Sequence, residues 1–260
     1  EGNFHGRTTG VISFSSDEDS TKNFGPFQPG FISIPYNNIE ALTNALADTS
    51  VIAFLIEPIQ GEAGVIIPDD GFLAKAAALC KKMNVLFIAD EIQTGMGRTG
   101  FWFGYEHEEI VPDVITLAKG LGGGLPLGAM IAIGRAADLF QPGEHGSTFG
   151  GNPVSCAAGL AAIAEIEKKK LNEKALELGE YLKSELLKID GVSEVRGRGL
   201  LLGIALDRDW AKEIANFLMA KGVLVNAPNE KTIRIAPPLI ITKKECQIFV
   251  KIFKEVMANG

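Results

Sequence analysis

The chain has 260 residues, of which 46% are hydrophobic and 22% are charged, so it can bury the core of one large domain or two smaller ones. Its formal net charge is −7 and its isoelectric point is near 5.1. This acidic balance argues against nucleic acid or an anionic membrane as a partner, because both select a clustered basic face. The one basic stretch, Arg196–Gly199, predicts a turn before a strand. The most apolar long window, Val114–Gly134, contains a lysine, a proline and six glycines, which makes it a poor membrane-spanning helix.

The three cysteines, Cys80, Cys156 and Cys246, are far apart in the sequence. No pair has the spacing of metal ligands, and the odd number argues against a disulfide framework. The three histidines have no metal-ligand spacing either. We therefore expect no metal site and a reducing, cytoplasmic location.

The first half of the chain predicts a parallel sheet. Three apolar runs have the composition of buried parallel strands: Val51–Ile56, Val85–Ala89 and Val114–Ala118. Between the first two, Gly71–Met83 predicts a helix, which Asp69 and Asp70 would cap and Asn84 would end. Gly128–Gly134 predicts a further buried strand. Strands that alternate with a helix in this way are typical of an α/β fold.

The pattern changes after Gly150. Asn152 and Pro153 form a strong helix start, and the predicted helix continues to Leu187 with a break near Leu171. The remaining predicted elements are short strands (Val192–Arg196, Leu200–Leu206, Val223–Asn226 and Thr232–Ala236) and helices (Trp210–Lys221 and Lys243–Met257). We therefore expect residues 1–150 to form a large domain, and residues 151–260 to supply an interdomain helix and a smaller C-terminal α+β domain.

Charged side chains follow each of the first three predicted strands. Glu57 follows the first, Asp90 and Glu91 follow the second, and Lys119 follows the third. In parallel sheets, binding sites form outside the carboxyl ends of the strands. Each residue alone could be an ordinary surface charge, but together they place two or more carboxylates and an amine along one edge of the sheet.

Lys119 and Asp90 suit the chemistry of one cofactor. A desolvated lysine amine can react with a carbonyl group, and the glycines of Gly120–Gly124 allow another group to approach closely. Because the lysine precedes these glycines, the segment is not a phosphate-binding Walker loop. Pyridoxal phosphate needs a lysine for its aldehyde and a carboxylate that keeps its ring nitrogen protonated. Asp90 is the candidate carboxylate, whereas Glu91 points away if the strand conformation continues.

Five segments resemble the motifs of the class III (fold type I) pyridoxal-phosphate-dependent aminotransferases: Glu57–Gly64, Leu86–Gly100, Thr116–Pro126, His145–Pro153 and Ile233–Pro238. They occur in the family's order, and the interval between Asp90 and Lys119 (119 − 90 = 29) also fits. The resemblance covers essentially the whole chain. It implies the α/β fold of the fold type I transferases, with a mostly parallel sheet, helices on both faces, and a homodimer whose active site is shared across the interface.

The resemblance assigns cofactor-binding roles to Phe4, Asp90, Glu91, Ile92, Gln93, Lys119 and Thr148. Phe4 and Ile92 should stack on the two faces of the ring, and Asp90 should pair with its nitrogen. Lys119, the catalytic residue, should bind the aldehyde covalently and move the proton during the reaction. Thr148 should bind the phosphate from the partner subunit.

Two arginines are expected to bind substrate carboxylates, because a guanidinium grips a carboxylate through two parallel hydrogen bonds. By the resemblance, Arg7 binds the carboxylate remote from the reacting amine, and Arg234 binds the α-carboxylate of glutamate. Glu62 should cover Arg234 when no α-carboxylate is present, because an uncompensated buried arginine is costly. Ser147 should also contact substrate.

Within the family, the chain most resembles the acetylornithine aminotransferases of arginine biosynthesis. We therefore expect transfer of the terminal amino group of N-acetylornithine to 2-oxoglutarate, with ornithine 5-aminotransferase as the alternative. Segments Gly122–Gly128 and Val223–Asn226 favour the first, and Phe24–Phe27 and Pro142–His145 favour the second.

The chain begins at Glu1 without a methionine, and the family normally begins about a third of a chain earlier. We therefore expect an N-terminally truncated piece with an incomplete large domain, unstable or inactive in isolation because a strand edge would lie unpaired. A non-catalytic subunit and another class III enzyme, such as an aminomutase or decarboxylase, stay open as alternatives. The context of Arg234 speaks mildly against the last.

Overall fold

The computed structural model describes residues 1–259 and divides into two compact units, each discontinuous in sequence. Unit 1 consists of Glu1–Gln60, Pro68–Gln93 and Tyr105–Ile163. Unit 2 consists of Gly61–Ile67, Thr94–Gly104 and Ala164–Gly260. The domain boundary after residue 150 stays a prediction, and unit 2 contains two short segments from the first half of the chain that it did not anticipate.

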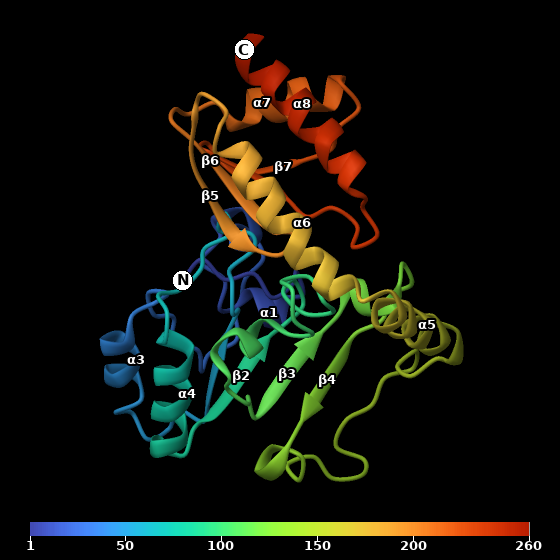
Figure 1. Ribbon diagram of the computed structural model, residues 1–260. Coiled ribbons are helices and arrows are strands. Elements are labelled where there is room, and N and C mark those ends of the chain that lie inside the picture. Colours follow the sequence, from blue (N-terminus) through green and yellow to red (C-terminus); the bar gives the residue numbers. More distant parts are fainter. Residues whose placement is uncertain (260) are drawn as a thin grey trace. The chain divides into compact units, whose positions relative to one another are not determined.

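Unit 1 is built on a four-stranded sheet in the order β1-β2-β3-β4. Figure 1 shows β2, β3 and β4 side by side. Its strands are β1 (Ala53–Ile56), β2 (Leu86–Asp90), β3 (Val114–Leu117) and β4 (Ala129–Ala132). The first three are parallel, whereas β4 runs antiparallel to β3. Helix α4 (Phe72–Met83) connects β1 to β2 and packs against β2, burying Leu73 and Ala76. This confirms the predicted α/β fold with a mostly parallel sheet.

Two predictions about unit 1 are wrong in detail. The N-cap position of α4 is taken by Gly71 and not by Asp69 or Asp70, and the positive φ of Gly71, 80°, turns the chain into the helix. The predicted end at Asn84 is confirmed, since this residue adopts the left-handed conformation that closes the last turn. Strand β4 is not buried as predicted: it is an edge of the described sheet, and Met130 and Ile131 are about half exposed. An apolar run does not reveal which strand lies at an edge.

Several short helices have no strong sequence signal: α1 (Thr9–Ile12), α2 (Glu18–Thr21), α3 (Ile39–Ala45), η1 (Gly104–Glu108), η2 (Lys119–Gly122) and η3 (Gly134–Ala136). The start of α3 follows from capping, because the Asn38 side chain accepts a hydrogen bond from the Ala41 backbone N–H at 2.8 Å. Within residues 1–259, no helix combines the length and the apolar character that crossing a membrane requires.

Unit 2 is an antiparallel sheet with helices. Helix α5 (Pro153–Lys169) contains the division between the units, and the predicted break is confirmed at Lys170, where α6 (Leu171–Leu186) begins. The sheet order is β5-β6-β8-β7, from β5 (Val192–Arg198), β6 (Leu201–Leu206), β7 (Asn226–Asn229) and β8 (Thr232–Ile235). Helices α6 and α7 (Ala211–Ala220) pack on this sheet, and α8 (Lys243–Asn259) packs against those two helices. The core between them includes Leu202, Ile204 and Ile233, all fully buried.

Two boundaries in unit 2 differ from the predictions. Arg196 and Arg198 lie within β5, so the predicted turn over Arg196–Gly199 is wrong, and the turn falls at Gly199 and Leu200. The strand predicted to begin at Val223 begins at Asn226, because the Val223 backbone N–H bonds to the Leu218 carbonyl and closes helix α7.

Candidate functional site

Three charged residues lie at one edge of the unit 1 sheet, as predicted. Because β1, β2 and β3 are parallel neighbours, their carboxyl ends share an edge. Glu57 follows β1, Asp90 is the last residue of β2, and Lys119 lies two residues beyond β3. Glu57 and Asp90 are buried, so they are not ordinary surface charges. An ionised carboxylate in such a position needs hydrogen-bond donors or cations around it.

Asp90 has three such donors. Its Oδ1 accepts hydrogen bonds from the Ile92 backbone N–H and the Thr116 hydroxyl, both at 3.1 Å, and His5 Nδ1 lies 2.6 Å from Oδ2. A carboxylate offers about four acceptor positions. Oδ2 therefore keeps capacity for one more donor, which suits a protonated ring nitrogen.

His5 is the hydrogen-bond partner of this carboxylate that can carry a positive charge. The hydrogen bond to Asp90 raises the pKa of His5 above its ordinary value of 6.5, against the lowering effect of burial, and the charges of Asp90 and Glu57 add to the increase. No pattern in the sequence pointed to a role for His5, because His5 and Asp90 are 85 positions apart and only the fold brings them together.

Phe4 lies beside the candidate catalytic lysine. Its backbone N–H donates to Glu57 Oε1 at 3.0 Å, which ties the N-terminal segment to the end of β1. Lys119 Nζ lies 5.9 Å from the centroid of the Phe4 ring, and the Arg7 guanidinium carbon lies 5.3 Å from the same centroid. These residues place an aromatic face, an amine and a guanidinium together. Glu57 was expected only at the end of a strand, and its contact with Phe4 adds it to the site as well.

The backbone of Lys119 adopts a conformation that is rare for a residue with a side chain. Its φ is +46°, in the left-handed region, at the start of η2. Such a conformation costs about 1–3 kcal/mol and occurs preferentially at functional sites. The chain therefore turns sharply at Lys119, directly before the glycine-rich segment.

The other predicted cofactor residues lie in two places. Glu91 is 1% exposed and accepts a hydrogen bond from the Tyr105 backbone N–H at 2.9 Å, so it braces the following segment. Ile92 and Gln93 are half-buried directly after it. Ser147 and Thr148 lie in an exposed loop, where the Ser147 hydroxyl accepts a local hydrogen bond from the Gly150 N–H.

A cavity of about 770 Å³ opens within unit 1 beside these residues. Its lining includes Phe4, His5, Glu57 and Asp90. A space of this size, with mostly apolar walls and a few convergent polar groups, has the character of a small-molecule site. Among residues 1–259 no group of three or more His, Cys, Asp or Glu side chains is arranged to hold a metal ion.

Unit 2 contains the predicted arginine–carboxylate pair. Arg234 Nη1 lies 2.8 Å from Glu62 Oε1, and the Arg234 side chain is only 14% exposed. Arg234 comes from β8, and Glu62 comes from the Gly61–Ile67 segment that joins unit 2 from the first half of the chain. Glu62 is 35% exposed, so one member of the pair is held by the sheet and the other lies nearer the solvent.

Comparisons with known proteins agree with this arrangement. Residues 1–257 match the family model described as Aminotransferase class-III. The chain is 49% identical over 262 aligned positions to the ornithine aminotransferase of Bacillus subtilis, an alignment that covers 100% of this chain and 65% of that protein. The chain therefore spans less than two thirds of the length of this curated relative.

Solved structures of aminotransferases are also similar to this chain. An ornithine aminotransferase from Toxoplasma gondii, with partial occupancy of PLP at its active site, matches 99% of this chain and 62% of its own with a TM-score of 0.94 and 39% identity. The acetylornithine aminotransferase of Elizabethkingia anophelis matches 90% of this chain and 64% of its own with a TM-score of 0.83 and 43% identity.

Proposed function

Because the chain belongs to the class-III aminotransferases, we propose that the protein is a transaminase that uses Lys119 as its catalytic residue. The single observation that carries this proposal is the strand-end arrangement of unit 1, where buried Asp90 ends β2 and Lys119 follows β3. The cofactor of this family is pyridoxal phosphate. When bound, it supplies an aldehyde for amines and a ring that accepts electrons.

The residues present fit this cofactor. Asp90 has one acceptor position left for the ring nitrogen, and His5 Nδ1 lies 2.6 Å from its Oδ2. Phe4 offers its face to the ring, and Ile92 and Gln93 follow Asp90 in the chain. Lys119 Nζ would bind the aldehyde, and once released would take the proton from the substrate carbon that bears the amino group. Glu91, already bonded to Tyr105, would keep this segment in place.

The Arg234–Glu62 pair supports a reaction at a terminal amine. Arg234 would bind the α-carboxylate of glutamate or 2-oxoglutarate through two hydrogen bonds. When the donor presents a terminal amine without an adjacent carboxylate, Glu62 would neutralise Arg234 in the arrangement that the structure records at 2.8 Å. Arg7, exposed beside Phe4, would take the donor's distant carboxylate, and Ser147 would contact the substrate.

For the donor we propose ornithine, with transfer of its terminal amino group to 2-oxoglutarate. The sequence favoured N-acetylornithine, but the curated relatives that match essentially all of the chain are named ornithine aminotransferase, at 47–49% identity. N-acetylornithine stays the second candidate because an acetylornithine aminotransferase structure is 43% identical. A role in arginine biosynthesis belongs to that second candidate.

We also propose a homodimer that shares its active site, with Thr148 serving the phosphate of the partner's cofactor. Support comes from the exposed apolar side chains that follow Thr148, namely Phe149 at 83%, Val154 at 68% and Leu160 at 70% exposed. Exposed apolar side chains concentrated in one region are typical of a protein interface. The three free cysteines fit a reducing compartment, and the cytoplasm is the proposed location.

The donor assignment is tested with the purified holoenzyme and 2-oxoglutarate. We expect kcat/KM for ornithine to exceed that for N-acetylornithine by about tenfold or more, a difference that a pocket built for one polar group can produce. A reversed preference would select the second candidate. Absence of transamination with both donors, in a protein that binds the cofactor, would refute the proposed donor class.

A further inference from the structure

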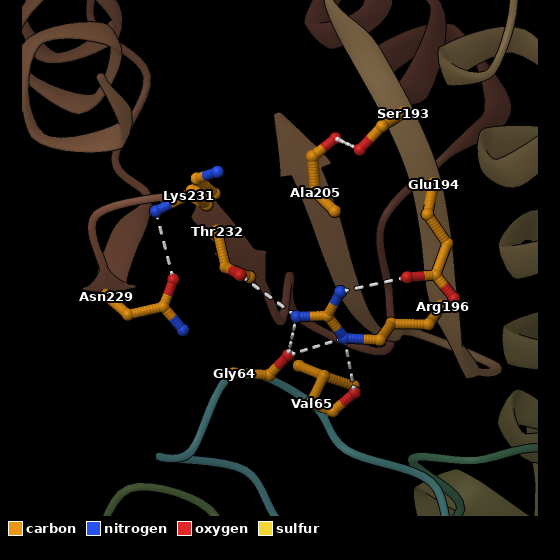
Figure 2. A network of polar contacts seen from close by, with 9 residues as sticks. All are labelled: Gly64, Val65, Ser193, Glu194, Arg196, Ala205, Asn229, Lys231 and Thr232. Carbon is orange, nitrogen blue, oxygen red and sulfur yellow. Dashed lines mark hydrogen bonds and ion pairs between the residues drawn. The ribbon is translucent and has the colours of Figure 1, made fainter. Parts of the chain in front are cut away.

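The segment that carries Glu62 is joined to the sheet of unit 2 by a polar network around Arg196. Figure 2 shows its centre, where the Arg196 side chain of β5 reaches the backbone of the segment that carries Glu62. Arg196 Nε donates to the carbonyls of Gly64 and Val65, both at 3.0 Å, and Nη2 donates to the Gly64 carbonyl at 2.7 Å. The Arg196 side chain is only 19% exposed.

The position of Arg196 follows from the register of the sheet. Arg196 pairs with Gly203 across β5 and β6, and Gly203 pairs with Arg234 across β6 and β8. Residues directly opposite each other point to the same face of a sheet. The two arginines therefore flank Gly203 on one face, whereas their neighbours Val195 and Ile233 belong to the helix-covered core.

The absence of a side chain at Gly203 makes room for the Glu62 segment. A Cβ atom at Gly203 would lie 2.9 Å from the Gly64 carbonyl oxygen and 3.0 Å from Val65 Cβ. The turn at Gly64 and Val65 thus sits directly over Gly203, between the two arginines. One arginine binds its backbone, and the other binds the Glu62 carboxylate.

The bonds of Arg196 to the Gly64–Val65 backbone are harder to replace than the ion pair of Arg234 with Glu62. Arg196 also donates from Nη2 to the Thr232 hydroxyl at 2.9 Å, and its Nη1 lies 3.1 Å from Glu194 Oε2. The planar guanidinium of Arg196 therefore donates to several acceptors in fixed directions. Most of these acceptors are backbone carbonyls or the hydroxyl of a buried threonine. The Glu62–Arg234 contact joins Arg234 Nη1 to a carboxylate that is 35% exposed, and an incoming carboxylate can take the place of that carboxylate.

We propose that Arg196 is a positioning residue for donor selection: it holds the Gly64–Val65 turn so that Glu62 covers Arg234 for terminal-amine donors and returns to the same place after glutamate leaves. This inference rests on the proposed role of Glu62. Loss of the Arg196 anchor lets Glu62 drift, which leaves Arg234 uncovered. An uncovered Arg234 favours glutamate and disfavours ornithine.

The test compares the two half-reactions in the holoenzyme. For Arg196→Lys and Arg196→Met we expect the ratio of kcat/KM for ornithine to that for glutamate to fall about tenfold, the size of effect expected between residues in one network. Lysine should fail like methionine, because a point charge cannot bridge two carbonyls and a hydroxyl. Glu194→Gln is the matched control: it removes the outer ion pair, leaves the fork on Gly64 and Val65, and should not change the ratio.

A double-mutant cycle separates positioning from general stability. In a Glu62→Gln background, Arg196→Lys should change the ratio less than about twofold, because the group that it positions is already disabled. The same tenfold change in that background, or an equal loss for both substrates in the single variant, would overturn the positioning role. If Glu62→Gln alone leaves the ratio unchanged, the proposed role of Glu62 fails, and this inference fails with it.

Discussion

The two units place their polar side chains by different structural means. In unit 1, Glu57, Asp90 and Lys119 follow parallel strands, so the direction of the sheet alone gathers them at one edge. In unit 2, Arg196 and Arg234 lie within antiparallel strands, and their separation is set by the register through Gly203. Unit 1 depends on where strands end, and unit 2 depends on which residues lie opposite each other.

This difference has a consequence for function. Residues after a strand end are joined by loops and can vary in type with little effect on the sheet. In unit 2, Arg196, Gly203 and Arg234 form a row across neighbouring strands. Because these residues lie directly opposite one another within the sheet, a change at one position moves its neighbours. We therefore expect substitutions in unit 1 to affect chemistry more than stability, and substitutions in the row of unit 2 to affect both.

The largest expected effect is that of Lys119→Ala in the holoenzyme. Removal of the amine that binds the cofactor and moves the proton should lower transamination by about 1,000-fold or more while the unfolding midpoint changes little. Borohydride reduction followed by peptide mapping should label Lys119 in the unaltered protein. Lys75→Ala, an exposed lysine on α4, is the control and should retain activity. Labelling at another lysine would refute the strand-end explanation of unit 1.

The next largest effect should come from Gly203→Ala, which tests the row in unit 2. The added methyl group would meet the Gly64 carbonyl oxygen and Val65 Cβ at about 3 Å, so the turn must move. Overpacking of this kind costs about 1–3 kcal/mol. Urea unfolding should show this loss together with a lower preference for ornithine over glutamate.

Gly146→Ala provides the comparison for Gly203→Ala, since a Cβ atom there meets nothing within 4 Å. It should leave both stability and donor preference nearly unchanged. If Gly203→Ala behaves like this control, the turn is not seated on the sheet as described, and the contrast between the units loses its basis.

The charged residues at the sheet edge of unit 1 could be predicted from the sequence, because the pattern that indicates them is local. Each apolar run ends in a charged residue, and parallel strands bring such ends together without further information. The chain order of β1, β2 and β3 is also their spatial order, so the sequence alone could place Asp90 and Lys119 on neighbouring strands. His5 could not, because its partner lies 85 residues away and no spacing rule connects them.

The row in unit 2 could not be predicted for a different reason. Arg196 was assigned to a turn, since a short basic segment with two glycines resembles one, and its role depends on the pairing of β5 with β6. Glu62 and Arg234 were paired only by family resemblance, because the segment Gly61–Ile67 enters unit 2 from a distant part of the sequence. The register of β5 against β6 and the entry of Gly61–Ile67 into unit 2 depend on how distant parts of the chain pack. No local pattern in a single sequence indicates such packing.

The smallest expected effect concerns the pH dependence of stability at the edge of unit 1. The pKa of His5 is raised in the folded protein by its hydrogen bond to Asp90, so the folded state holds a proton that the unfolded state releases above pH 6.5. The stabilisation is therefore complete below pH 6.5 and is lost as the pH rises through the folded pKa. A charge-assisted hydrogen bond of this kind contributes about 1–2 kcal/mol.

His5→Gln should therefore lower the free energy of unfolding most near pH 6, and the difference from the unaltered protein should shrink towards pH 9. His145→Gln, at an exposed histidine of the same unit, is the control for the loss of a histidine as such. NMR titration gives a direct check, because Asp90→Asn should lower the pKa of His5. A difference that grows with pH would mean that His5 does not share its proton with Asp90, and the edge of unit 1 would then depend on strand direction alone, without the electrostatic support of its N-terminal segment.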